Sequence, residues 1–126
     1  MTFNERYKNN IILIKSFEFS KNIIEFSELL EKQRKYVVSN QLIKSGTSIG
    51  ANIKEAQNGE SKRDFIHKLK IALKEADETE YWLFLCDEMN TYPDCKYLIT
   101  QLESIIKILN KIISSSTNSL DNNKLN

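Results

Sequence analysis

Residues 41–83 read QLIKSGTSIGANIKEAQNGESKRDFIHKLKIALKEADETEYWL, and this stretch decides the fold. It predicts a helix rich in small residues, a turn centred on Gly59, and a second helix that begins at Ser61. Asp64 follows Ser61 by three residues, which is the spacing of a helix capping box. Gly59 suits the left-handed position that commonly follows a helix. The stretch therefore predicts two consecutive helices joined by a tight turn.

Two glycines, Gly46 and Gly50, fall in the middle of the first of these helices. Glycine inside a helix costs about 1 kcal/mol relative to alanine, so both positions need a physical reason. Close approach of a neighbouring helix is one reason, because small side chains let two backbones come together. A ligand held against the backbone is the alternative.

Along most of the chain, apolar residues recur every three or four positions, as in amphipathic helices. The spacing predicts helices over about 10–32, 35–57 and 61–89, and a fourth after a break at 90–94. Three glycines and one proline in 126 residues leave few places to turn. We therefore predict an all-α fold, an antiparallel up-down-up-down four-helix bundle over residues 1–115. The polar residues 116–126 are predicted to form a disordered tail.

Composition excludes several classes of protein. The chain is 40% hydrophobic and 28% charged, with a formal net charge of +1, as in ordinary soluble proteins. It has no apolar run approaching the roughly 18 residues of a membrane span, and its N-terminal residues do not resemble a signal peptide. Cys86 and Cys95 lack metal-ligand spacing. We expect a cytoplasmic protein with reduced thiols, no metal, no cofactor and no membrane partner.

Catalytic groups are sparse in the sequence. His67 is the only histidine and lies among basic residues, where a solvated side chain is the ordinary interpretation. Ser48 and Cys86 have no adjacent general base in the sequence, and an activated nucleophile needs one. We therefore expect no catalytic residue and no enzymatic activity.

Charge is sorted along the second predicted helix of the opening stretch. Residues 61–74 contain five basic side chains and one acid, whereas residues 75–90 contain six acids and no lysine or arginine. This order opposes the helix macrodipole, which favours acids early and bases late. Helix stability therefore does not explain it. A solvated face, a polyanion-binding strip and a head-to-tail contact between subunits all remain open.

The same helix carries a second apolar stripe, separate from the Phe65 and Leu69 stripe. It consists of Ile71, Trp82, Leu85 and Met89. Exposed apolar patches usually mark interfaces, so this stripe predicts self-association, with Asp77 and Glu78 as acidic contacts. Packing on a neighbouring helix of the same bundle is the alternative. A charge gradient suits a ring with heterologous contacts.

Glu80 is placed by helical spacing on the flank of the core, where a carboxylate needs hydrogen-bond partners. Asn52 or Ser48 of the preceding helix, or a hydroxyl of a neighbouring helix, could satisfy it. The pattern favours a buried polar layer that fixes the register of the helices over a catalytic carboxylate.

The order of residues in 41–83 resembles a family of four-helix proteins encoded in intervening sequences of bacterial 23S rRNA genes. It is also similar to the accessory variability determinant proteins of diversity-generating retroelements. The resemblance rests on glutamine, a basic residue, Ser-Ile, Asn-Ile and Glu-Ala in this order, followed by Phe-Ile and spaced acids. Here these are Gln41, Lys44, Ser48-Ile49, Asn52-Ile53, Glu55-Ala56, Phe65-Ile66 and Glu75.

This resemblance implies a homopentameric ring. It also implies a basic surface that binds RNA or DNA and engages a reverse transcriptase or another nucleic-acid enzyme. We expect that surface to comprise Lys44, Lys54, Lys62, Arg63, Lys70 and Lys74. Only Lys44 occupies a motif position, where arginine is common in the family, and the others follow from charge. A scaffold that binds only protein, through the Trp82 stripe, is the alternative function.

Overall fold

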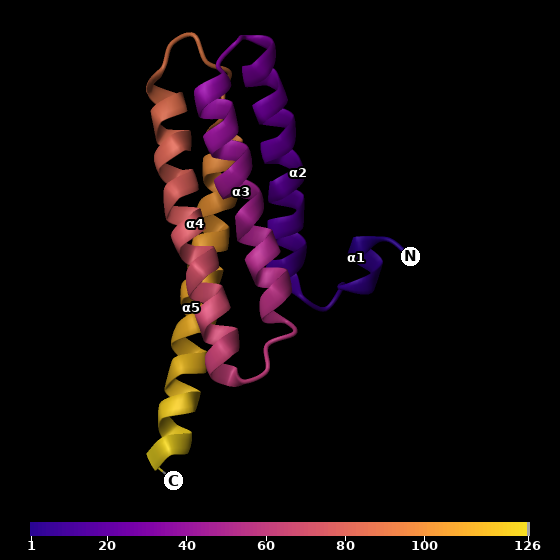
Figure 1. Ribbon diagram of the computed structural model, residues 1–126, viewed down its shortest axis with the longest axis vertical. Coiled ribbons are helices and arrows are strands. Elements are labelled where there is room, and N and C mark those ends of the chain that lie inside the picture. The colour runs from indigo at the N-terminus through magenta and orange to yellow at the C-terminus, as the bar shows by residue number, and fades with distance from the viewer. Residues whose placement is uncertain (126) are drawn as a thin grey trace.

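The computed structural model describes residues 1–125, which form five helices and no strand. The helices are α1 (Phe3–Arg6), α2 (Ile11–Lys32), α3 (Tyr36–Ala56), α4 (Lys62–Glu88) and α5 (Lys96–Leu125). The four long helices lie side by side, and consecutive ones run in opposite directions (Figure 1). Helix pairs α2–α3, α3–α4, α4–α5 and α2–α5 are in contact. The predicted all-α class is confirmed. Within the described part of the chain, none of the helices is long and apolar enough to cross a membrane.

The core is built from one apolar stripe of each long helix, because the spacing of three and four residues places these side chains on one face. Its largest members are at most 1% exposed. They include Phe19 and Ile23 of α2, Leu42 and Ile49 of α3, Leu69 and Leu83 of α4, and Leu102 and Leu109 of α5. The outward faces of the helices are thereby left for other contacts.

Gly46 lies where α3 packs directly against α2. A Cβ atom at this position would lie 2.8 Å from Cγ2 and 2.9 Å from Cγ1 of Ile23, which is fully buried. Gly50 is less constrained, since its Cβ atom would meet the Ser20 hydroxyl at 3.3 Å. Close packing of α3 on α2 therefore explains the glycine at position 46. This was the first of the two explanations that the sequence offered.

Alanine substitutions at the two glycines are expected to have opposite effects on stability. Gly46→Ala should lower the free energy of unfolding by about 1–2 kcal/mol, because overpacking against the stiff Ile23 exceeds the gain in helix propensity. Gly50→Ala should leave stability equal or raise it by up to about 1 kcal/mol, since the Ser20 hydroxyl can rotate away. Urea unfolding of both variants measures the difference. Equal stability of the two would show that α2 and α3 are not in tight contact at Gly46.

The connections of α3 differ from the sequence interpretation. The α2–α3 turn lacks glycine, and Arg34 takes the left-handed conformation there, with φ 62°. The Lys35 N–H donates back to the Leu30 carbonyl at 2.9 Å and closes the end of α2. Gly59 was predicted to be left-handed, and this is wrong. Glycine fits there because a Cβ atom would meet the Ala56 carbonyl oxygen at 3.2 Å.

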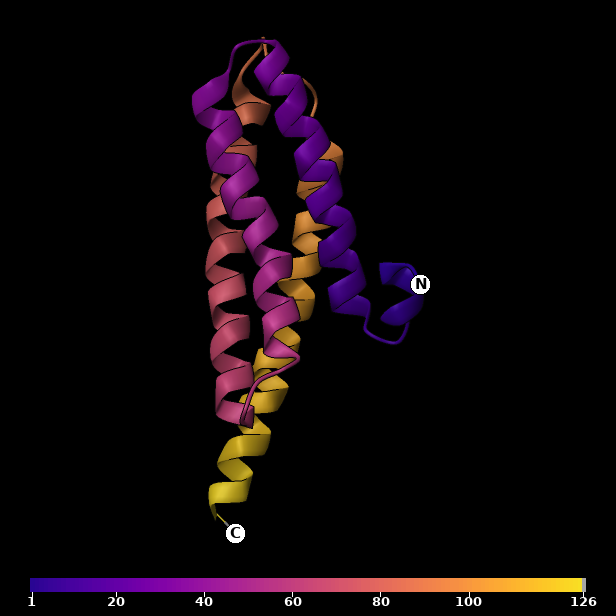
Figure 2. The ribbon, with the colours of Figure 1, turned by 45° about the vertical axis from the view of Figure 1, so that its right-hand side comes forward.

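Both ends of the chain also differ from the prediction. A short helix, α1, precedes the four long ones, and its Phe3 ring stacks on Phe17 of α2 with centroids 3.9 Å apart. The predicted disordered tail, 116–126, is helical through residue 125 as part of α5, and residue 126 lies outside the described residues. Thr117 and Leu120 continue the spacing of Ile113 and are partly buried, which extends the helix. Its last turns project beyond the other helices (Figure 2).

The buried polar contact between α3 and α4 involves different residues from those predicted. The hydroxyls of Thr79 and Ser45 are hydrogen-bonded to each other at 2.9 Å, and both side chains are fully buried. Asn52 instead donates to the Ser48 carbonyl of its own helix. Glu80 lines a groove formed by α4 alone. The polar layer exists, but small hydroxyls form it because they need no buried charge.

Candidate nucleic-acid and assembly surfaces

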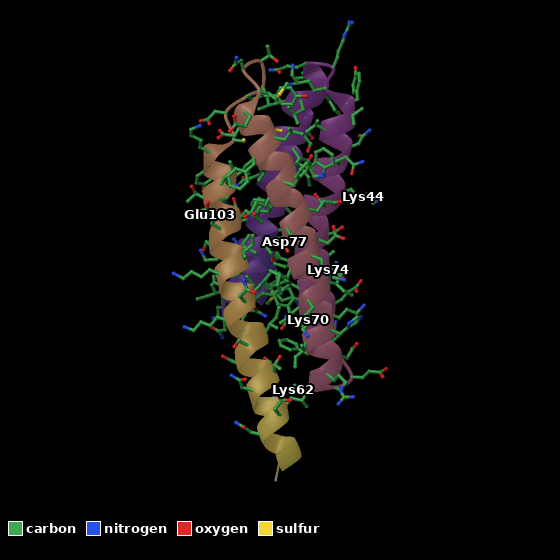
Figure 3. The ribbon with its side chains drawn as sticks, turned by 90° about the vertical axis from the view of Figure 1, so that its left-hand side faces the viewer. Lys44, Lys62, Lys70, Lys74, Asp77 and Glu103 are labelled. Carbon is green, nitrogen blue, oxygen red and sulfur yellow. The ribbon has the colours of Figure 1, made fainter. Side chains whose placement is uncertain are left out.

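The outward side of α4 carries the basic residues predicted from charge. At about 100° per residue, Arg63, Lys70 and Lys74 project opposite the buried Leu69 and Ala76, and all three are exposed. Lys62, Lys70, Lys74 and Asp77 follow one another along α4 (Figure 3). Lys62, in the first turn of α4, is exposed as well. We call these four side chains on the first half of α4 the basic strip (Lys62, Arg63, Lys70 and Lys74).

The structure does not bring all six predicted basic residues together. Lys44 is exposed on α3, at the edge of the view in Figure 3. Lys54 faces α2 and α1 instead, with its Nζ 5.4 Å from the centroid of the Tyr7 ring, and it lines the groove between α2 and α3. Lys68 pairs with Glu55 of α3 at 3.1 Å. Lys44 and Lys54, which belong to α3, are therefore not part of the basic strip on α4.

The predicted apolar stripe divides into two parts. Ile71 and Trp82 are partly buried, so the sequence alternative of packing within the same chain applies to them. Leu85 and Met89 are exposed at 38% and 45%. Tyr81 (63% exposed) and Phe84 (47%) were not predicted, although the same helical spacing places Tyr81 on the outward side. We call Tyr81, Phe84, Leu85 and Met89 the apolar patch.

Acidic side chains surround the apolar patch. A shallow groove of about 430 Å³ is lined by Tyr81, Phe84 and Leu85 with Asp77, Glu80 and Glu88. Asp77 and Glu78, the predicted acidic contacts, are both exposed. The outward side of α4 is thus basic over its first half, and apolar with an acidic rim over its second half. Such a surface suits polyanions at one end and a protein partner at the other.

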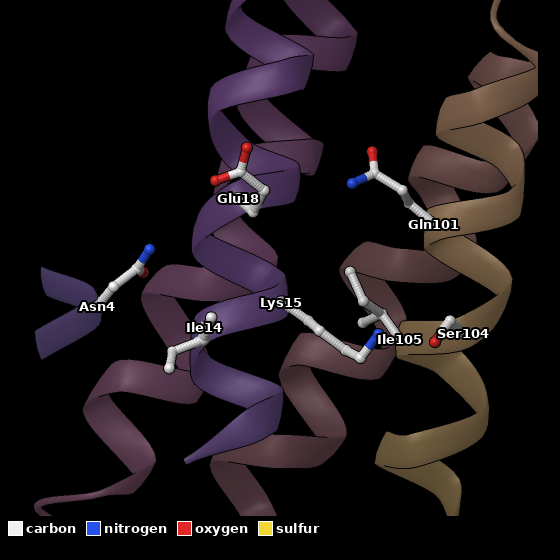
Figure 4. Close-up of a pocket in the computed structure, with 7 residues that line it drawn as sticks. All are labelled: Asn4, Ile14, Lys15, Glu18, Gln101, Ser104 and Ile105. Atoms are coloured by element: carbon white, nitrogen blue, oxygen red, sulfur yellow. The ribbon is translucent and has the colours of Figure 1, made fainter. Parts of the chain in front are cut away.

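The seam between α2 and α5 holds a different cavity, of about 350 Å³ (Figure 4). Its polar lining comes from Asn4 of α1, from Lys15 and Glu18 of α2, and from Gln101 and Ser104 of α5. Lys15 reaches across the seam toward Ser104 and Ile105 in Figure 4. In the described residues, no group of three or more histidine, cysteine or acidic residues could hold a metal ion.

Comparison with known proteins places the chain in a family. A family model described as 23S rRNA-intervening sequence protein matches residues 8–111. The chain belongs to this family. A crystal structure of a protein of unknown function, from the S23 ribosomal protein family of Bacteroides thetaiotaomicron, is 44% identical with a TM-score of 0.76. The similarity covers 81% of this chain and 97% of that chain. The comparison with curated proteins gives no match.

The family match confirms the resemblance drawn from residues 41–83. It covers α2, α3 and α4, and about half of α5. It stops at residue 111, so α1 and the last turns of α5 with Thr117 and Leu120 lie outside the matched range. The similarity to retroelement proteins stays a prediction.

The two thiols of this family member lie in the core between the end of α4 and the start of α5, and both are 1% exposed. Burial, with a smaller effect of Cys95, raises the pKa of Cys86 to about 12. Burial also raises the pKa of Cys95 to about 11, and its Sγ contacts the Leu83 carbonyl at 3.3 Å. Such thiols are poor nucleophiles because little thiolate forms.

These pKa values predict that stability falls with rising pH above about 9. An unfolded cysteine loses its proton near pH 9.0, whereas the folded thiols keep theirs until about 11 and 12. The unfolded state then binds fewer protons, so the free energy of unfolding falls by about 1.4 kcal/mol per pH unit for each thiol. Denaturant titrations at pH 8 to 11 should show a shallower fall for a Cys86→Ala/Cys95→Ala variant. The same slope in both proteins would contradict the assignment to these thiols.

Proposed function

We propose that this chain is a non-enzymatic, oligomeric four-helix-bundle protein that binds nucleic acid, without sequence preference, through the basic strip. One observation carries the proposal. Lys62, Arg63, Lys70 and Lys74 are exposed together on one helix, and none of them forms an ion pair among the described residues. Lys62 donates one hydrogen bond to Ser119 Oγ at 2.6 Å, and the charges of all four side chains are otherwise available to an external polyanion.

The chemistry of these side chains sets the kind of binding. Lysine and arginine at the surface contact phosphate oxygens, and this contact releases counterions from the nucleic acid. Affinity then falls steeply with salt and depends little on base sequence. No aromatic side chain lies within the basic strip, so base stacking is not part of the proposal.

Self-association is the second part of the proposal. The apolar patch offers aromatic and aliphatic side chains of the type that dominate protein interfaces. We propose that a further copy of the chain covers it in a closed ring, a homopentamer by family resemblance. A ring repeats the basic strip once per subunit, so several weak phosphate contacts act on one strand and raise the overall affinity.

A protein-only scaffold is the second candidate, and the apolar patch with its acidic rim favours it. In that case the patch contacts another protein. An adaptor for a reverse transcriptase or another nucleic-acid enzyme would combine the two functions.

Size exclusion coupled to light scattering, with and without a mixed-sequence RNA, tests the proposal. We expect a mass several times that of one chain, and a further increase with RNA at low salt that is lost at high salt. An oligomer whose mass does not change with RNA at any salt concentration would favour the protein-only scaffold. The mass of a single chain, unchanged by RNA, would reject both self-association and nucleic-acid binding.

A further inference from the structure

The groove between α2 and α3 is an apolar pocket of about 310 Å³, which we call the α2–α3 pocket. Phe3 of α1 forms part of its wall and stacks on Phe17 of α2, with ring centroids 3.9 Å apart. Its lining on α3 includes Gly50 and Ala51, whose small side chains leave the space open. The volume lies at the lower end of the range for ligand pockets, about 300–1,000 Å³, so it suits a single aromatic ring.

The polar groups of the α2–α3 pocket leave little for a polar ligand. The hydroxyls of Ser16, Ser20 and Thr47 all donate to carbonyl oxygens of their own helices. Among the described residues that line the pocket, Lys54 is the only charged one. A nucleobase presents several donors and acceptors that would find few partners here, and burying them unpaired is unfavourable. An apolar side chain has no such groups, so the lining favours an aromatic or aliphatic residue of a protein as the occupant.

The charge of the α2–α3 pocket is opposite in sign to the charges around the apolar patch. Lys54 is partly buried and forms no ion pair among the described residues. The groove at the apolar patch is lined by three acids, Asp77, Glu80 and Glu88. An aromatic side chain of the patch that enters the pocket of another copy would carry these carboxylates toward Lys54. Opposite charges across an interface favour docking and fix its register.

The pocket and the patch lie on different sides of the bundle. In Figure 1, α1 and α2 are on one side and α4 is on the other. One copy can therefore contact one neighbour through its patch and a second neighbour through its pocket. Such a heterologous contact closes into a ring when the rotation between copies allows it. A contact of patch with patch would join two copies only.

We propose that the apolar patch of one copy of this chain docks on the α2–α3 pocket of the next copy, with Phe84 as the side chain that enters. Phe84 suits the pocket better than Tyr81, because a buried tyrosine hydroxyl needs a hydrogen-bond partner. This inference rests on the proposed self-association and deepens it, by naming the face that the neighbour contributes. It depends on Phe3 of α1, which lies outside the family match at residues 8–111.

Ala51→Phe tests the pocket, because Ala51 is exposed and the added ring takes the place of the neighbour's side chain. Asn40→Phe is the matched control, at an exposed position of α3 that does not line the pocket. Light scattering across a dilution series measures the mass. The dissociation constant of Ala51→Phe should rise about thirtyfold or more, as for loss of an aromatic anchor, and that of Asn40→Phe should not change. The melting temperature of diluted, single-chain Ala51→Phe should be no lower than that of the wild type.

A mixture of two variants shows which faces meet. Phe84→Glu keeps the pocket and Ala51→Phe keeps the patch, so each alone should have the mass of a single chain. Their equimolar mixture should have the mass of two chains, because one intact contact remains and no ring can close.

Three results would overturn the inference. Assembly of Ala51→Phe at wild-type strength would reject the pocket and leave self-association through the patch intact. A mixture that stays at the mass of a single chain would show that the patch and the pocket do not meet. A wild type that remains a single chain at every concentration would reject self-association as well.

Discussion

Replacing Lys70 and Lys74 together by glutamate is expected to abolish retention on mixed oligonucleotides at low salt. The two side chains lie one turn apart in the middle of the basic strip, and both are exposed. Each charge-assisted contact to phosphate contributes about 1.5–3 kcal/mol, so the loss of two weakens binding about a hundredfold or more. Retention on an immobilised mixed-sequence oligonucleotide column measures the effect.

Lys107 and Lys111 of α5 provide the control. They are also exposed and four residues apart, so Lys107→Glu/Lys111→Glu changes net charge equally without touching the basic strip. This variant should still be retained on the column, with only a small decrease in retention. The wild type should show a plot of log K against log salt with a slope of about −3, given about four phosphate contacts to a single strand. Equal losses in the two variants would mean that overall charge, and not the strip, governs binding.

Phe84→Glu is expected to break self-association. Phe84 is 47% exposed and lines one groove with Tyr81 and Leu85, and the acids of that groove would repel an added carboxylate. Loss of an aromatic anchor costs about 2 kcal/mol or more, so the dissociation constant should rise about thirtyfold or more. Light scattering across a dilution series should then show the mass of a single chain at concentrations where the wild type is assembled.

Ile11→Glu is the matched control for Phe84→Glu. Ile11 is 64% exposed in the first turn of α2, where an acid suits the positive end of the helix. This variant should keep the mass of the wild type. An unchanged mass in Phe84→Glu, with its far-ultraviolet circular dichroism also unchanged, would remove the apolar patch from the assembly proposal.

The sequence predicted the elements whose signals are local and strong. Ser61 caps α4 by accepting from the Asp64 N–H at 3.0 Å, which is the first half of the predicted capping box. The Asp64 carboxylate accepts from the Glu60 N–H at 3.3 Å instead of completing the box. Gly46 predicted a close helix contact, because the loss of helix stability caused by a glycine needs a compensating contact. Arg34 could not be foreseen, since a left-handed arginine leaves no mark in composition and is held by the hydrogen bonds of the α2–α3 turn. The last turns of α5 were predicted to be disordered because most residues there are polar. The helical spacing of Thr117 and Leu120 is too weak a signal among them.

The candidate surfaces were only partly predictable. Helical spacing placed Arg63, Lys70 and Lys74 on one side correctly, because all three lie on a single helix. It could not place Lys54 relative to them, since that requires knowing how α3 is rotated against α4. Trp82 was assigned to an interface because helical spacing places it on the second apolar stripe of α4, but it packs against the core and is partly buried. Only the arrangement of the helices distinguishes these cases.

The charge order of α4 bears on how the chain acquires its tertiary structure. Lys62 and Arg63 occupy its first turn, and Asp87 and Glu88 its last, so the isolated segment opposes its own dipole. As a free peptide it should be poorly helical, and docking on α3 and α5 must supply what local sequence lacks. The outward side of α4 is therefore ordered only once the bundle has folded. A partly folded chain leaving the ribosome would not yet hold the cationic side chains of α4 in a line that RNA could bind.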